Sequence, residues 1–419
     1  MDGIHAVANL YRCQGEARYQ TDAAPLRQFC IDAVNRSGLT VVGELFHQFD
    51  GGGVTGCVVL AESHLAIHTW PELGSVTLDV YVCNYTQDNS DKARQVVDEL
   101  MQLFAPEDFV RHEVPRDRQF MYEHMNPDYG FFLGSSKLIE RSKTAFQTLE
   151  IHDTPQFGKL FRLDDCFMTS EREEFVYHET MIHPALTSLA APKKVLIIGG
   201  GDGGAAEEAL KHPSVEQVTL VELDGRVVEI ARQHFGAIHH GVFESPRLRL
   251  LIEDGLKFIA NTSEKFDHIV LDLPDPVGPA EQLYEEQFFR DCKRALREGG
   301  VLSLHMGSPW ARPERVRTLY ARLAKLFTFA RPYTMFIPLY GSLWSMCACS
   351  DGTDVTALSA AEIDKRITAR GLTDLQYYNG AAHHGLFALP NFVRAMTVDA
   401  QPRPRLVTTD PLPRTGSLD

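Results

Sequence analysis

Residues 195–204 read Val-Leu-Ile-Ile-Gly-Gly-Gly-Asp-Gly-Gly, an apolar run that passes directly into a glycine-rich loop. The run Val195 to Ile198 is typical of a buried strand, and glycines after it let the backbone approach a bound nucleoside closely, just before a helix begins. Glu222 lies about 20 residues further on, at the end of the next apolar run, where a carboxylate can bind ribose hydroxyls. The loop departs from GxGxxG and carries Asp202, which argues against NAD and favours a nucleoside attached to a sulfonium.

Regular alternation of strands and helices surrounds this stretch. After Val195 to Ile198, the strand-like runs are Gln217 to Glu222, Leu248 to Glu253, His268 to Asp272 and Val301 to Leu304. Helical segments separate them, among them Arg226 to Phe235 and Gln282 to Leu296. This pattern predicts an α/β fold with a Rossmann-like, doubly wound parallel sheet.

The N-terminal part of the chain has a different pattern. Val41 to Phe49 and Val76 to Val82 are strand-like, and Ser90 to Leu103 is an amphipathic helix, so this part alternates strands and helices. The turn-rich segment Asn126 to Gly130 is the predicted boundary. The expected domains are an N-terminal one over 1–125, a small β domain over 126–175, a Rossmann-like one over 176–398, and a Pro- and Thr-rich, disordered tail over 399–419.

Composition narrows the class of protein. The 41 basic and 56 acidic residues give a net charge of −15, which argues against nucleic-acid binding and suits a cationic substrate, although acidity for solubility alone is also common. No apolar run reaches the ~18 residues of a membrane span, and no signal-peptide pattern is visible at the N-terminus. The eight cysteines show no CxxC spacing, which favours a reducing cytoplasm.

A second informative stretch, residues 61–72, reads Ala-Glu-Ser-His-Leu-Ala-Ile-His-Thr-Trp-Pro-Glu. It resembles the self-cleavage site of bacterial and archaeal S-adenosylmethionine decarboxylases. The resemblance implies that the N-terminal domain is an α+β sandwich of the pyruvoyl decarboxylase type. It also implies that the chain breaks between Glu62 and Ser63 and that Ser63 becomes a pyruvoyl group. Decarboxylation of an amino acid needs an electron sink, which a pyruvoyl can supply. Making it requires a serine hydroxyl against the preceding carbonyl and a nearby proton shuttle, for which His68 is the candidate.

The same resemblance assigns further roles in the N-terminal half. Thr55 would assist cleavage, and Cys83 would donate the proton to the substrate carbon after CO2 leaves. Phe49 and Trp70 would sandwich the substrate adenine, and Glu72 would lie near the ribose. Taken singly, such residues are usually structural; their order and spacing together carry the assignment. The family places this site across a dimer interface, and Asn84, where many relatives have glycine, is the one visible departure.

The C-terminal half resembles the spermidine synthases, a family of aminopropyltransferases, over residues 130–397. Asp272-Leu-Pro-Asp-Pro-Val-Gly-Pro-Ala-Glu281 is similar to the gate loop of that family. Four other segments agree with it: Gln147, Tyr177-His178-Glu179, Glu253-Asp254-Gly255 and the late run that begins at Tyr377. The small β domain is part of the same resemblance.

The chemistry of aminopropyl transfer explains why acidic residues gather in these motifs. The attacking amine must be neutral, so a carboxylate has to remove its proton, and each remaining ammonium needs an anionic partner. The resemblance implies that Asp272 is the base, helped by Tyr177, and that Asp202 and Asp275 hold amines. It also implies donor contacts from Gln147 and His178, ribose contacts from Glu222, adenine contacts from Asp254, and a diamine-site role for Tyr340.

Three departures from the spermidine synthase pattern touch the acceptor pocket. They are Leu273-Pro274 in the gate loop, Leu339-Tyr-Gly-Ser342, and His305-Met-Gly-Ser-Pro-Trp310. Putrescine is the first expectation for the acceptor, but cadaverine, diaminopropane, agmatine and spermidine remain open.

The sequence thus predicts a bifunctional enzyme of polyamine biosynthesis, with S-adenosylmethionine, its decarboxylated form and a diamine as ligands. The expected cofactor is the pyruvoyl group from Ser63, without a metal or dinucleotide. A homo-oligomer, dimer or larger, is expected. Three alternatives remain: the first half decarboxylates ornithine or arginine, one half is a non-catalytic dimerisation or regulatory module, or the second half is a plain methyltransferase.

Overall fold

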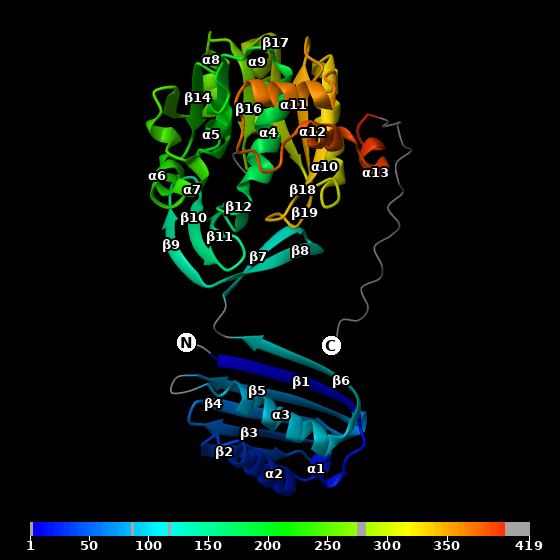
Figure 1. Ribbon diagram of the computed structural model, residues 1–419. Helices are drawn as coiled ribbons and strands as arrows, with labels where there is room; N and C mark the ends of the chain where they lie inside the picture. The colour runs from blue at the N-terminus through cyan, green and yellow to red at the C-terminus, as the bar shows by residue number, and fades with distance from the viewer. Residues whose placement is uncertain (1–2, 85–87, 116–118, 275–281, 399–419) are drawn as a thin grey trace. The chain divides into compact units, whose positions relative to one another are not determined.

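In the computed structural model, the described residues are 3–84, 88–115, 119–274 and 282–398. The chain divides into two compact units, residues 1–119 and 120–419 (Figure 1). No helix in the described ranges combines the length and the apolar character needed to cross a membrane.

The N-terminal unit, blue to cyan in Figure 1, is built on a six-stranded sheet in which all neighbours are antiparallel, in the order β2-β3-β4-β5-β1-β6. Its strands are β1 (Gly3–Cys13), β2 (Val41–Gln48), β3 (Val54–Leu60), β4 (Ser63–Trp70), β5 (Ser75–Cys83) and β6 (Pro106–Pro115). Its helices are α1 (Arg18–Thr21), α2 (Ala23–Arg36) and α3 (Ser90–Phe104), with the 3-10 turn η1 (Pro71–Leu73).

One face of this sheet is covered by helices and the other is not. Buried side chains alternate along β4 and β5, and those on the inner face form one core with the apolar stripes of α2 and α3. The opposite face carries half-buried and exposed groups. Large apolar groups are exposed on strands β1, β2, β3, β4 and β6 of this unit, including Tyr11, Leu45, Val59, Trp70 and Val110.

The second unit begins with β structure. Strands β7 (Gln119–Asn126) and β8 (Tyr129–Ser135) form a two-stranded sheet. A four-stranded antiparallel sheet follows, with β9 (Lys137–Lys143), β10 (Thr148–Thr154), β11 (Gly158–Leu163) and β12 (Cys166–Ser170). The segment 126–130, which the sequence placed at a domain boundary, instead spans the end of β7, the turn at Pro127 and Asp128, and the start of β8. Hairpin turns and linkers favour the same residues, so composition alone does not separate them.

The rest of the second unit is a seven-stranded sheet in the order β15-β14-β13-β16-β17-β19-β18. Its strands are β13 (Lys194–Gly199), β14 (Gln217–Glu222), β15 (Leu248–Ile252), β16 (Phe266–Asp272), β17 (Leu296–Gly307), β18 (Phe329–Ile337) and β19 (Ser342–Ser350). The five strands β13 to β17 are parallel, which confirms the predicted Rossmann-like sheet. Strand β19, which the sequence analysis did not identify, pairs antiparallel with both β17 and β18.

Helices flank this sheet. They are α4 (Glu174–Ser188), α5 (Gly204–Leu210), α6 (Gly225–His234), α7 (Gly236–His239), α8 (Gly255–Asn261), α9 (Glu286–Ala295), α10 (Pro313–Leu326), α11 (Ala360–Ala369), α12 (Gly380–Phe387) and α13 (Asn391–Arg394), with the 3-10 turn η2 (Val242–Glu244). Two large apolar clusters pack around the strands. The predicted strands and helices agree with the structure except at their ends. The largest shift is in β17, which begins five residues before the predicted Val301 and ends three residues after Leu304. The predicted tail, 399–419, lies outside the described residues.

Candidate active sites

The glycine-rich loop and Asp272 meet where strands β13 and β16 lie side by side. Gly199 pairs with Asp272 across these strands, and the backbone N–H of Gly200 donates to the Asp272 carbonyl at 3.0 Å. From β13 the chain runs outward through β14 and β15 on one side, and through β16 and β17 on the other. A doubly wound sheet binds its ligands outside the carboxyl ends of its strands at such a switch point.

Acidic and imidazole groups converge at this point. His178, Asp202 and Asp272 each offer a ligand atom within 4.8 Å of the others. The Tyr177 hydroxyl donates to Asp272 Oδ1 at 2.9 Å. His178 lies between two carboxylates, with Nδ1 2.7 Å from Glu174 Oε2 and Nε2 3.4 Å from Asp202 Oδ2.

The surroundings shift the pKa values of this group in opposite directions. Burial, together with the charge of Asp202, raises the pKa of Asp272 to about 6, although His178 and Tyr177 oppose the shift. Burial works against protonation of His178, but Asp202 and Glu174 outweigh it and raise its pKa well above the ordinary value. Burial also works against ionisation of Asp202, yet His178 lowers its pKa. The site thus holds an ionised Asp202 beside a carboxyl that can exchange a proton near neutral pH.

The groups predicted to hold the donor lie at the ends of neighbouring strands. Glu222 ends β14 and accepts from the backbone N–H of Asp224 at 2.9 Å, and burial raises its pKa to about 7. Asp254 caps α8 by accepting from Leu256 N at 2.9 Å. Gln147, just before β10, donates through Nε2 to Asp224 Oδ2 at 3.1 Å. Asp224 therefore links Gln147 to the strand end that carries Glu222.

Tyr340 lies beside the acid cluster, in the connection from β18 to β19. Its ring centroid is 6.2 Å from that of Tyr177 and 4.7 Å from that of Trp344, and its hydroxyl donates to the Met168 carbonyl at 2.8 Å. Asp275, predicted to hold an amine, lies outside the described residues. The backbone just before it is anchored, because His305 Nε2 donates to the Leu273 carbonyl at 2.7 Å.

Two residues of this site were missed by the sequence analysis, Glu174 and Asp224, and His305 was named only as part of a departure from the family pattern, without its contact to Leu273. Glu174 lies four residues before His178, so the two share one helix face, a spacing that was visible in the sequence. Asp224 lies two residues after Glu222, at the N-cap of α6. His305 reaches Leu273 only through the pairing of β16 and β17, which no local pattern shows.

Gly204 is required because His178 packs directly on it. An alanine Cβ there would lie 2.3 Å from His178 Cε1, and that ring is buried and held by two carboxylates. We expect Gly204→Ala to cost ~1–3 kcal/mol of stability by overpacking and to displace His178. Thermal unfolding should show this loss. Gly385→Ala, inside α12 with nothing within 4 Å of the new Cβ, is the control and should be neutral or slightly stabilising; equal melting points would contradict the packing argument.

In the N-terminal unit, Ser63 begins β4 in a strained conformation. Its φ is 140°, a region that residues other than glycine rarely adopt. The carbonyl of the preceding Glu62 accepts from the backbone N–H of Cys83 at 3.0 Å. Asn89, almost fully buried, donates through Nδ2 to the Glu62 carboxylate and, at 3.1 Å, to the Cys83 carbonyl. The bond before Ser63 is therefore held against β5, with its carbonyl polarised by a fixed donor.

The other predicted residues of this unit gather at the opposite end of β4. Thr55 pairs with His68, and their side chains lie 2.5 Å apart, Oγ1 to Nδ1. Trp70 lies 6.0 Å from the His68 ring, and the exposed Phe49 follows β2 at the same end. His68 lies five positions after Ser63 in β4, which corresponds to about 16 Å at ~3.3 Å per residue of strand. Within one chain, Glu62, Ser63 and Cys83 come together, as do Thr55, His68 and Trp70, but the two groups do not meet. Glu72 lies in η1, beyond Trp70.

Among the described residues, two sets of side chains have the spacing of a metal site. One is His178, Asp202 and Asp272, and the other is His5, His64 and Asp79 in the N-terminal unit. In the first set His178 contacts Asp202 while Asp272 accepts from the Tyr177 hydroxyl, and in the second both imidazoles contact the Asp79 carboxylate. A pyruvoyl group made from Ser63 fits its surroundings, since residue 63 starts a strand at a strained position beside Cys83.

Comparison with known families agrees with the two units. Residues 4–117 match the S-adenosylmethionine decarboxylase family, and residues 174–359 match the spermine/spermidine synthase domain. A polyamine aminopropyltransferase of Nitrosomonas europaea is 48% identical over 278 residues, which are 66% of this chain and 85% of that protein.

Solved structures give the same result for the fold. A spermidine synthase in complex with the transition-state analogue AdoDATO matches with a TM-score of 0.63 and 35% identity, covering 68% of this chain and 96% of its own. The spermidine synthase from Thermotoga maritima matches with a TM-score of 0.61 and 34% identity, covering 68% of this chain and 95% of its own.

Proposed function

Since the chain belongs to the polyamine aminopropyltransferase family and also carries an S-adenosylmethionine decarboxylase domain, we propose that both parts are catalytic and act in sequence. The first part decarboxylates S-adenosylmethionine. The second transfers the aminopropyl group of the product to putrescine, which gives spermidine and methylthioadenosine. The single observation that carries this proposal is the presence of both domains on one chain, because the product of the first reaction is the donor for the second.

The first step is self-cleavage between Glu62 and Ser63. The strain at Ser63 and the Cys83 N–H on the Glu62 carbonyl both favour attack by the serine hydroxyl on that carbonyl. The resulting pyruvoyl group supplies an electron sink for the carbanion left by departing CO2. Cys83, one pairing position from Ser63, returns a proton to that carbon.

Thr55 and His68 act on Ser63 of a second copy of the chain. Within one chain they lie about 16 Å from the serine by strand rise, on the sheet face that the unit's own helices leave uncovered. Exposed apolar groups on that face, such as Leu45 and Val59, are suited to bury against a second copy. Phe49, Trp70 and Glu72 then bind the adenosine from His68's end of the sheet. We therefore propose that the protein is at least a dimer.

In the second part, the acid cluster binds and deprotonates the acceptor. Asp272 removes the proton from the attacking amine, with Tyr177 fixing its carboxylate, and the ionised Asp202 holds an ammonium. Glu222 takes the donor ribose, Asp254 the adenine amino group, and Gln147 and His178 the aminopropyl end. Tyr340 lines the diamine site. Asp275 keeps its proposed amine-binding role from the sequence alone.

Aminopropyl transfer is expected to depend on pH through two carboxyl groups. Asp272 must be ionised to accept a proton and Glu222 to bind the ribose, and their pKa values lie at about 6 and about 7. The kcat/KM for the donor should therefore be constant at alkaline pH, fall about tenfold per pH unit just below 7, and fall more steeply below 6. Initial rates with decarboxylated S-adenosylmethionine from pH 5 to 9 measure this, and a flat profile would contradict it.

A product assay tests the proposal as a whole. Purified protein receives S-adenosylmethionine, ornithine and arginine together without added diamine, and the products are identified by mass spectrometry. Decarboxylated S-adenosylmethionine is the expected product, and putrescine, added next among a series of diamines, should give spermidine. Putrescine or agmatine formed in the first stage would instead make the N-terminal part an ornithine or arginine decarboxylase. An uncut chain with no first-stage product would make that part a non-catalytic module.

A further inference from the structure

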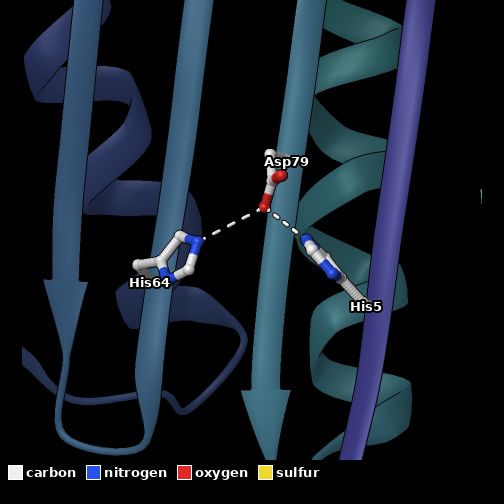
Figure 2. Close-up of side chains that lie close together, drawn as sticks. All are labelled: His5, His64 and Asp79. Atoms are coloured by element: carbon white, nitrogen blue, oxygen red, sulfur yellow. Dashed lines mark hydrogen bonds and ion pairs between the residues drawn. The ribbon is translucent and has the colours of Figure 1, made fainter. Parts of the chain in front are cut away.

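Three polar side chains that the proposed mechanism leaves without a role lie beside Ser63. His5 on β1, His64 on β4 and Asp79 on β5 occupy three adjacent strands, with β5 in the middle. Figure 2 shows both imidazole rings pointing toward the Asp79 carboxylate from either side. Asp79 Oδ1 lies 2.7 Å from His5 Nε2 and 3.4 Å from His64 Nε2.

To act as a base His64 must be neutral, and its contact with Asp79 indicates which ring nitrogen then carries the proton. A carboxylate oxygen accepts hydrogen bonds, so we assign this proton to the Nε2 that faces Asp79. The neutral ring then presents the lone pair of Nδ1, which lies 3.3 Å from Ser63 Oγ. The order Ser63 Oγ, His64, Asp79 is the order of nucleophile, base and orienting carboxylate in an activated serine. These distances are long for hydrogen bonds, as is common before a reaction partner is bound.

The electrophile beside this serine is also prepared. The Glu62 carbonyl accepts from the Cys83 N–H at 3.0 Å, which is where charge develops when the serine attacks. Within the same chain His68 is about 16 Å away along β4, whereas His64 Nδ1 lies 3.3 Å from Ser63 Oγ, so His64 reaches the serine without a second copy.

We propose that His64 is the general base for the first step of self-cleavage and that Asp79 and His5 are positioning residues that orient it. This inference rests on the proposed cleavage at Ser63. Ser63 Oγ bonds to the carbonyl carbon of Glu62 as its proton passes to His64 Nδ1. The peptide C–N bond then breaks, and the same proton passes to the nitrogen of residue 63. The product is an ester between Glu62 and the Ser63 oxygen, with His64 returned to its neutral form.

The experiment follows cleavage of freshly synthesised, full-length chain on denaturing gels after cell-free translation is stopped. His64→Ala is expected to slow cleavage about 100-fold or more, the ordinary contribution of a general base. Added imidazole should restore part of the rate, which a purely structural defect would not allow. His112→Ala is the matched control, since it removes a histidine from the same sheet face at a position paired with Val7, outside the cluster.

Hydroxylamine identifies the step that is blocked, because it cuts esters and leaves amides intact. The slow His64→Ala chain should remain insensitive to it, as expected when the ester does not form. Accumulation of a hydroxylamine-sensitive chain would overturn the assignment of His64 to the first step.

A double-mutant cycle tests the positioning role. Asp79→Asn alone should slow cleavage at least tenfold, but it should add little to His64→Ala, because it acts through that ring. Additive losses would show that Asp79 does not act through His64 and would overturn its positioning role. Loss of cleavage on treatment with EDTA, restored by Zn²⁺, would overturn it in favour of a metal site.

The wild-type chain separates this inference from the proposed function. If the wild-type chain is cut before residue 63 and His64→Ala is cut equally fast, the role of His64 as base is rejected while self-cleavage is retained. If it is never cut there, both fail.

Discussion

Ser63→Ala is expected to remain a single chain of 47.0 kDa and to lose S-adenosylmethionine decarboxylation entirely. Alanine offers no hydroxyl to attack the Glu62 carbonyl, so neither the break nor the pyruvoyl group can form. Without an electron sink the rate should fall to background, a loss of about 10⁶-fold or more. Denaturing gels measure the cleavage, and release of CO2 from carboxyl-labelled substrate measures the decarboxylation.

The same variant should leave the second reaction intact. Ser63 lies in the N-terminal unit, while the acid cluster lies wholly in the second unit. Spermidine formation from supplied decarboxylated S-adenosylmethionine and putrescine should therefore keep the wild-type rate. Ser75→Ala is the control, because Ser75 is a half-buried serine in the next strand whose hydroxyl bonds only to the Leu73 carbonyl. A Ser63→Ala chain that still released CO2 would contradict the proposed cofactor.

Asp272→Asn should abolish most of the aminopropyl transfer and spare the decarboxylation. An amide has almost the same shape but cannot take a proton from the attacking amine, so kcat should fall about 10²–10⁴-fold. Tyr177→Phe removes the hydrogen bond that fixes the carboxylate and should have a smaller effect. Methylthioadenosine release in the presence of both substrates is the readout.

The pH profile distinguishes a lost base from a lost fold. In Asp272→Asn the fall near pH 6 should disappear, and only the fall near pH 7 from Glu222 should remain. Asp153→Asn, an exposed change on β10 of the same unit, should behave as wild type in rate and profile. An unchanged rate in Asp272→Asn would remove Asp272 from the mechanism.

Much of the second site was predictable because its residues follow strands in a parallel sheet. Val195 to Ile198, Gln217 to Glu222 and His268 to Asp272 are apolar runs whose last residues fall at one edge of the sheet whatever the detailed packing. The glycines after β13 occur where neighbouring groups leave no room for a Cβ, as the His178 ring does at Gly204. Local sequence is sufficient there, because parallel topology places the carboxyl ends of the strands together.

The first site was predictable only in part, because an antiparallel sheet does not bring strand ends together in that way. Ser63 and His68 are five residues apart in sequence, yet the extended strand holds them about 16 Å apart. Which residue faces Ser63 depends on pairing between strands from distant parts of the chain, and this pairing brings Asp79 and His5 next to His64.

The sequence by itself determined the two domain families, the strand runs of the Rossmann-like sheet and the acids at their ends, because these follow from local periodicity and from motifs. Only the tertiary structure decided that β19 runs antiparallel and that His5, Asp79 and His64 form one network beside Ser63. Each of these depends on strand register, which long-range packing sets and which local sequence does not encode.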